Sequence, residues 1–176
     1  VLTVAVLNDD EPFYYKSSNG SDRGIIPDYY TLAAKNTTLK FTYKKYPSQE
    51  EAVKAVKNGE ADIVGLFSNG IILSQKYGLA LTDSFYAVDN ILLKKSGTKL
   101  DRIKTIAVVK RNSASLSDNV KKEFPNAICK TYETAKSCFE ALKEGNADAV
   151  VIGHPSATWL MNQTNANAYN IIPIPY

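Results

Sequence analysis

The chain carries one pattern twice: residues 51–64 read Glu-Ala-Val-Lys-Ala-Val-Lys-Asn-Gly-Glu-Ala-Asp-Ile-Val, and residues 137–150 read Ser-Cys-Phe-Glu-Ala-Leu-Lys-Glu-Gly-Asn-Ala-Asp-Ala-Val. Six residues match at a constant offset of 86 positions, among them Gly59 with Gly145 and Asp62 with Asp148. Each stretch predicts an amphipathic helix, then a glycine that ends the helix in the left-handed conformation. The apolar residues that follow predict a short strand of the kind buried in parallel sheets.

The repeat continues upstream of both stretches. The first strand, helix and second strand are predicted over 3–7, 27–34 and 39–46 in one half, and over 105–109, about 115–124 and 127–132 in the other. Each half is thus an α/β unit, strand–helix–strand–helix–strand, with a mainly parallel sheet covered by helices. We expect two similar lobes, 1–88 and 89–176, connected near 86–91 and enclosing a cleft. Ligands of such folds bind beyond the carboxyl ends of the strands.

Composition excludes several function classes. The 21 basic and 18 acidic residues give a net charge of +3, and the lysines are scattered, so no nucleic-acid partner is expected. With two cysteines and one histidine, His154, no convincing metal-ligand set can be assembled. No nucleophile or phosphate-binding motif is present, so neither catalysis nor a cofactor is expected. No apolar run approaches the roughly 18 residues of a membrane-spanning helix.

Several segments, in this order and spacing, carry a resemblance to a known family: Glu11-Pro12-Phe13-Tyr14-Tyr15, Gly24-Ile25-Ile26-Pro27-Asp28-Tyr29, Leu39-Lys40-Phe41, the two repeated stretches, and Leu81-Thr82-Asp83-Ser84-Phe85-Tyr86. The chain resembles the family-3 extracellular solute-binding proteins, which have the periplasmic-binding-protein type 2 fold. More closely it resembles the Venus-flytrap sensor domains of bacterial membrane receptors such as histidine kinases. The resemblance implies an extracytoplasmic domain, periplasmic or at the cell surface, that closes on a small ligand. It would meet the membrane only through flanking segments.

Three alternatives stay open. The Gly-Ile-x-x-Asp-Tyr form at 24–29 is typical of sensor domains, whereas solute-binding components of ABC transporters more often read Gly-Phe-Asp-Val-Asp-Leu. A scaffolding domain with an empty cleft is a second alternative. A lyase-like enzyme on the same fold is the third, and His154 would be its one obvious acid–base group.

The family's amino-acid clamp is missing here. Amino-acid-binding relatives hold the ligand carboxylate with an Arg after the third strand of lobe 1, a position that falls at Ser74 or Gln75. They receive the ligand ammonium with an Asp after the last strand of lobe 2, where this chain has Gly153 and His154. The expected ligand is therefore a small polar or anionic solute, with Arg111 supplying the positive charge from lobe 2.

Candidate ligand-binding residues lie in the loops after the predicted strands. They are Phe13, Tyr14, Phe67, Ser68, Asn69 and Gln75 in lobe 1, and Arg111, Asn112, Ser113, Gly153 and His154 in lobe 2. For the aromatic residues and the Asn69-Gly70 turn, packing within the lobe is the alternative role. The matched pair Asp62 and Asp148 predicts a structural role, the satisfaction of backbone N–H groups in each lobe.

Two further expectations concern covalent and quaternary structure. Cys129 on the second strand of lobe 2 and Cys138 on the following helix are predicted to form a disulfide, with two buried free thiols as the alternative. Members of the family continue past 171–176 with a return strand and C-terminal helices, which we expect to be absent. A lobe without that strand has an open sheet edge, which can pair with a second copy in a homodimer.

Overall fold

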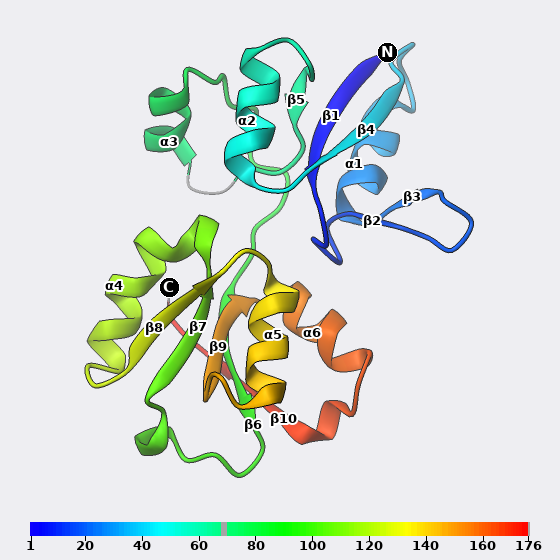
Figure 1. Ribbon diagram of the computed structural model, residues 1–176. Helices are drawn as coiled ribbons and strands as arrows, with labels where there is room; N and C mark the ends of the chain where they lie inside the picture. Colours follow the sequence, from blue (N-terminus) through cyan, green and yellow to red (C-terminus); the bar gives the residue numbers. More distant parts are fainter. Residues whose placement is uncertain (68–69, 176) are drawn as a thin grey trace. The chain divides into compact units, whose positions relative to one another are not determined.

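The chain folds as two compact units, Val1–Asp83 and Ser84–Tyr176 (Figure 1). The computed structural model describes the backbone of residues 1–67 and 70–175, and their side chains except at 70, 72–73 and 112–115. Residues 84–88, which sequence reasoning placed with the first lobe, belong to the second unit.

The first unit is built on a small parallel sheet. Its elements are β1 (Leu2–Leu7), β2 (Tyr15–Lys16), β3 (Asp22–Arg23), α1 (Ile25–Ala34), β4 (Phe41–Tyr46), α2 (Gln49–Lys57), β5 (Ile63–Val64) and α3 (Gly70–Tyr77). The strand order is β4-β1-β5, and both pairings are parallel. β2 and β3 form a separate antiparallel hairpin.

The second unit has a five-stranded sheet. Its elements are β6 (Asn90–Lys95), η1 (Leu100–Arg102), β7 (Thr105–Val109), η2 (Lys110–Asn112), α4 (Ser113–Glu123), β8 (Ile128–Tyr132), α5 (Ala135–Glu144), β9 (Ala149–Gly153), α6 (His154–Asn162), η3 (Ala166–Ala168) and β10 (Tyr169–Pro173). The strand order is β10-β6-β9-β7-β8. β7 is parallel to β8 and β9, whereas β6 is antiparallel to both β9 and β10.

The internal repeat is confirmed as repeated structure, and so is the α/β class with mainly parallel sheets. The order β4-β1-β5 corresponds to β8-β7-β9. Ser48 and Thr134, again 86 positions apart, each cap the helix that follows, because their side-chain oxygens accept from the N–H of Glu51 and Ser137. Gly145 ends α5 with a φ of 81°, the left-handed conformation that glycine adopts without strain.

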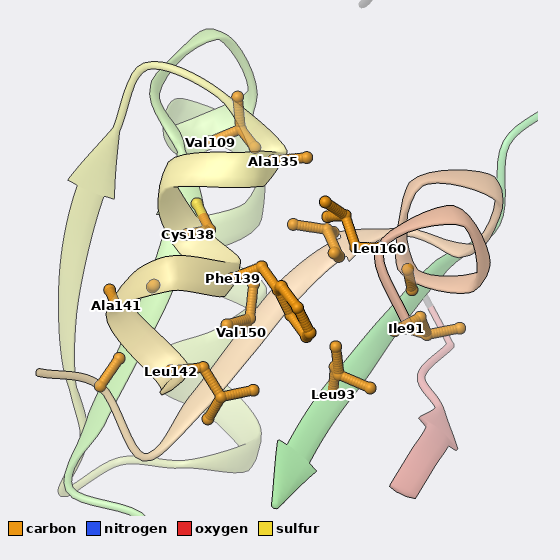
Figure 2. Packing of buried hydrophobic residues seen from close by; sticks show 14 residues of the cluster. Ile91, Leu93, Val109, Ala135, Cys138, Phe139, Ala141, Leu142, Val150 and Leu160 are labelled. Carbon is orange, nitrogen blue, oxygen red and sulfur yellow. The ribbon is translucent and has the colours of Figure 1, made fainter. Parts of the chain in front are cut away.

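The sheet of the second unit is covered on both faces. α5 and α6 pack on one face around Phe139, which Figure 2 shows between Val150 of β9 and Leu93 of β6. α4 packs on the other face through Leu116 and Val120. Burial of a side chain such as Phe139 stabilises the fold by about 2–3 kcal/mol. Both faces of the central strands are dry, which explains their almost uninterrupted apolar sequence.

The predicted disulfide is not present. Cys129 and Cys138 are both free thiols. Cys129 pairs in register with Ile106, whose side chain lies under α4, and it packs into that same cluster. Cys138 lies in the cluster under α5, on the opposite face. The sheet therefore separates the two sulfur atoms, and the prediction is wrong.

The antiparallel strand β6 is an element that the repeat did not reveal. Residues 86–91, expected as a connection, run into this strand, which lies between β9 and β10 (Figure 1). The first unit's order β4-β1-β5 matches β8-β7-β9 and contains no strand that corresponds to β6, so the comparison of the two halves could not find it. Among the described residues, no helix is long and apolar enough to cross a membrane, and no cluster of metal-ligating side chains is found.

Candidate functional site

In the second unit, the predicted ligand-binding residues gather at one edge of the sheet. β7 ends at Val109 and is followed by Arg111 and Asn112 in η2 and by Ser113 at the start of α4. β9 ends at Gly153, and His154 begins α6 directly after it. Because β7 and β9 are parallel neighbours, both segments lie at their shared carboxyl edge. The side chains of Asn112 and Ser113 lie outside the described residues.

Arg111 brings a positive charge to this edge. Its side chain is half-buried, and the positive charge of its guanidinium is close enough to affect the pKa of the Cys138 thiol, in the first turn of α5. Burial raises the pKa of that thiol to about 12, and the nearby charge of Arg111 opposes the rise. The thiol is therefore protonated at neutral pH and does not compete for the guanidinium as an anion would.

Gly153 and His154 are held by the segment that precedes β6. A Cβ at Gly153 would lie 2.6 Å from Cγ1 of Val88, so the side chain of Val88 can pack this closely against Gly153 only because residue 153 has no side chain. The backbone N–H of His154 donates to the carbonyl of Asp89 at 2.8 Å. The imidazole of His154 is exposed. His154 therefore presents its side chain, while its own N–H is already used.

In the first unit, Phe67 and Gln75 occupy the region after β5. The ring of Phe67 is half-buried and meets Tyr77 edge-on, with ring centroids 6.4 Å apart. Ser68 and Asn69 lie outside the described residues. Of the two positions that correspond to the family's Arg, Ser74 is buried and its hydroxyl donates to the carbonyl of Ile71 at 2.8 Å. Gln75 is exposed, so it is the one whose side chain a ligand can reach.

Phe13 and Tyr14 do not present their rings at a surface. Their exposed fractions are 3% and 1%, and both belong to the core of the first unit. The Tyr14 hydroxyl donates to Asp22 at 2.5 Å, and Lys16 pairs with the same carboxylate at 2.7 Å. The prediction that these aromatic rings wall a ligand is corrected accordingly: they pack on their own unit.

The loop that contains Phe13 turns inward because it is hydrogen-bonded to the start of α1. The N–H groups of Ile25 and Ile26 donate to the carbonyls of Pro12 and Phe13 at 3.1 and 2.9 Å. The backbone at Gly24 therefore approaches that loop closely: a Cβ there would lie 2.6 Å from both carbonyl oxygens. These bonds satisfy donors at the helix N-terminus that would otherwise be open to an anion. Sequence reasoning missed this docking, although Gly24 directly before a helix was a signal for it.

Comparisons with known proteins agree with this architecture. The virulence sensor protein BvgS of Bordetella bronchiseptica is 23% identical over 176 residues, and the alignment covers 98% of this chain. BvgS of Bordetella pertussis is 20% identical over 177 residues, again with 98% of this chain covered. The chain spans 14% of the length of these curated relatives.

Solved structures match over nearly the whole chain. The crystal structure of the periplasmic VFT2 domain of B. pertussis BvgS is 25% identical, with a TM-score of 0.80, covering 97% of this chain and 73% of that one. An ancestral arginine-binding protein bound to glutamine is 21% identical with a TM-score of 0.81, covering 99% of this chain and 79% of that one, which is a likeness of fold. The family model of the bacterial extracellular solute-binding proteins, family 3, matches residues 2–137, and the chain belongs to this family.

Proposed function

We propose that this chain is the extracytoplasmic sensor domain of a membrane receptor, and that it closes on a small polar or anionic ligand. The likeness to the periplasmic VFT2 domain of a sensor protein supports the receptor over the transporter. The chain spans a small fraction of the length of those relatives, as a single sensing domain of a larger receptor would.

One observation carries the ligand-binding proposal: Arg111 and His154 follow two adjacent parallel strands and lie at their common carboxyl edge. A guanidinium offers a planar set of donors that matches a carboxylate, sulfate or phosphate. The backbone turn from η2 into α4 adds the positive end of a helix dipole beside it. Together these groups favour an anion at this edge of the second unit.

The same residues argue against an ordinary α-amino acid. Neither Ser74 nor Gln75, the two positions at which the Arg of amino-acid-binding relatives can fall, carries a charge, and no carboxylate follows β9. A ligand ammonium would therefore lack its usual acceptor and would lose hydration without compensation. We further propose that the domain binds without catalysis, since its family is one of solute-binding proteins and the relatives it matches are sensor domains.

Calorimetric titration of the chain with sulfate, inorganic phosphate, acetate, glutamine and arginine tests the ligand class. We expect one of the anions to bind saturably, and Arg111→Met to weaken that binding at least about tenfold, since a hydrogen bond to a charged group is lost. Arg102→Met removes an exposed arginine of η1 and is expected to leave binding unchanged. Tight stoichiometric binding of glutamine or arginine would overturn the ligand class.

The receptor and the transporter differ in what flanks this chain in the full protein. A transmembrane helix that leads to a kinase or cyclase domain supports the receptor. A lipid-anchored cysteine upstream and a free C-terminus would instead support the solute-binding component of an ABC transporter. If none of the tested solutes binds and the flanks show no signalling domain, the scaffolding alternative replaces both.

A further inference from the structure

The strand β10 is an edge of the five-stranded sheet in the second unit, and it pairs only with β6 (Figure 1). Edge strands commonly carry charged side chains or are very short, which keeps them from pairing with another chain. Three other edges follow this rule: β4 has exposed Lys44 and Lys45, β8 has exposed Lys130, and β5 is two residues long. β10 reads Tyr-Asn-Ile-Ile-Pro and carries no charge. Among the described edges of these two sheets, β10 is therefore the one open to a further strand.

The hydrogen bonds between β10 and β6 show which backbone groups already have partners. The register places Ser96 opposite Ala168, and the N–H of Ser96 donates to the carbonyl of Ala168 at 2.8 Å. Hydrogen-bonded pairs recur at every second position of an antiparallel ladder. Asn170 and Ile172 therefore direct their N–H and carbonyl groups toward β6.

The residues between them direct their backbone groups away from the sheet. Tyr169 and Ile171 each present an N–H and a carbonyl on the outer side, and Pro173 presents a carbonyl but has no N–H. The same alternation holds on the far side of β6, where the N–H of His154 donates to the carbonyl of Asp89 at 2.8 Å. The open edge of β10 thus offers a donor and an acceptor at Tyr169 and again at Ile171.

This open edge is complementary to itself. If a second copy of β10 lies antiparallel with a two-fold axis at Asn170, Tyr169 of each copy faces Ile171 of the other. Each outward N–H then meets an outward carbonyl, and Pro173 lies beyond the paired residues. A two-fold axis at Ile171 would instead set Pro173 opposite Tyr169, and the carbonyl of Tyr169 would face a residue without a donor. The axis at Asn170 is therefore the better register.

The side chains that this register brings together suit a strand pair. On the face covered by α5 and α6, each Tyr169 meets an Ile171, and an aromatic beside a β-branched residue is a favourable cross-strand pair. On the other face, the two Asn170 side chains lie directly opposite each other. Asn170 is exposed, and its amide oxygen accepts from the hydroxyl of Ser96 at 3.2 Å. Within the described residues its NH₂ group donates to no acceptor, so it is available to the amide of the second copy.

We propose that β10 is an interface for a second copy of this chain, and that the two five-stranded sheets join there into one continuous sheet. One strand pair with few side chains falls short of the roughly 1,200 Å² of stable interfaces, so the dimer is weak, with a Kd on the order of 100 µM. This gives the homodimer expected from the sequence a defined edge and register. The inference does not rest on the proposed ligand.

The first test needs no variant, because neighbouring amides of one strand point in opposite directions. Backbone amide hydrogen exchange of the 176-residue chain is measured by NMR at about 50 µM and about 1 mM. We expect the amides of Tyr169 and Ile171 to exchange about threefold more slowly at the higher concentration, where the dimer prevails. The amides of Asn170 and Ile172 already donate to β6 and should not change. Sedimentation over the same range should show the mass rising toward that of a dimer.

Asn170→Asp and Asn170→Lys test the position of the two-fold axis. Each substitution places two like charges directly opposite each other in the dimer, so each variant alone is expected to stay monomeric at about 1 mM. An equimolar mixture places opposite charges at the axis and should form a heterodimer, which also shows that both variants fold. Thr131→Asp, at an exposed position of the opposite edge strand β8, is the matched control and should dimerise like the unsubstituted chain.

Three results would overturn the proposal. The first is a chain that remains monomeric at about 1 mM, or one that dimerises without slower exchange at Tyr169 and Ile171. The second is dimerisation of either charged variant alone, or no recovery of the dimer in their mixture. The third is an extended peptide of unrelated sequence that slows exchange at the same two amides while the chain stays monomeric, which would assign this edge to a different polypeptide.

Discussion

Asp148 and Thr105 are joined by two hydrogen bonds. The N–H of Asp148 donates to the carbonyl of Thr105 at 2.9 Å, and the carboxylate of Asp148 accepts from the N–H of Thr105 at 2.9 Å. The same carboxylate oxygen also accepts from the N–H of Lys104 at 2.9 Å. In the first unit, Asp62 and Thr3 repeat the arrangement at 2.9 and 2.7 Å. The aspartate of each repeat thus fixes where its strand begins beside the first strand.

We expect Asp148→Ala to destabilise the second unit by about 2 kcal/mol, because two backbone donors lose a charged acceptor. Asp62→Ala removes a single, more exposed bond and is expected to destabilise the first unit by about 1 kcal/mol. Chemical denaturation followed by amide hydrogen exchange assigns each loss to its own unit. Asp118→Ala, at an exposed position of α4, is the control and is expected to change stability by less than about 0.5 kcal/mol. Equal effects at residues 118 and 148 would contradict the role of Asp148.

The sequence was sufficient for those parts of the fold that the repeat encodes. Gly145 acts locally, at the end of a helix, so its role follows from neighbouring residues. Asp62 and Asp148 accept from residues 59 and 43 positions away, and it was their matched place in the repeat that predicted their structural role. β6 could not be found in this way, because its place between β9 and β10 is set by contacts with residues far away in the chain. The free thiols were missed for a related reason. Strand register decides that Cys129 faces α4 while Cys138 faces the sheet from α5, and spacing along the chain does not reveal it.

The candidate site was predicted unevenly for physical reasons. Residues that directly follow parallel strands, such as Arg111 and His154, must lie at the carboxyl edge, so topology alone placed them. Phe13 and Tyr14 sit in a longer loop whose direction depends on hydrogen bonds to the start of α1.

Gly24→Ala is expected to disrupt the first unit severely. Gly24 has a φ of 116°, and its added Cβ would lie 2.6 Å from two backbone carbonyl oxygens that cannot rotate away. We expect a loss of more than about 3 kcal/mol, from strain and overpacking together. Gly20→Ala is the matched control, since φ is 81° there but no atom lies within 4 Å of the new Cβ. A loss of about 1 kcal/mol is expected at that position. Thermal unfolding of both variants measures the difference, and a similar small loss in both would contradict the close approach at Gly24.

Both cysteines should titrate as thiols. Denatured, unreduced protein is expected to release two equivalents of the thiol reagent, because the sheet keeps Cys129 and Cys138 apart. In the folded protein, Cys138 should react very slowly, since burial raises its pKa to about 12 and leaves little thiolate. Cys138→Ala tests the assignment of the slow thiol. Protein that shows no thiol until a reductant is added would contain the disulfide after all.

The tyrosines of the first unit predict a loss of its stability at high pH. Burial raises the pKa of Tyr30 and of Tyr43 from 10.0 to about 12, and burial together with the Asp22 carboxylate also raises the pKa of Tyr14. The folded state therefore holds these protons at a pH where the unfolded chain has released them. This contribution to stability is complete below pH 10 and is lost as the pH rises toward about 12. Phenolate absorption should show these hydroxyls ionising only as the first unit unfolds.

Tyr14→Phe separates this explanation from a general alkaline effect. The substitution removes the hydroxyl that donates a hydrogen bond to the carboxylate of Asp22, while Lys16 continues to pair with that carboxylate. We expect it to lower stability at neutral pH by about 1 kcal/mol, the net value of one hydrogen bond. It should also flatten the decline of stability above pH 10, because one late-ionising group is gone. Tyr86→Phe, at an exposed position of the second unit, should leave the decline unchanged. If all tyrosines ionise near pH 10 while the first unit remains folded, then Tyr14, Tyr30 and the partly buried Tyr43 are not packed as the structure has them.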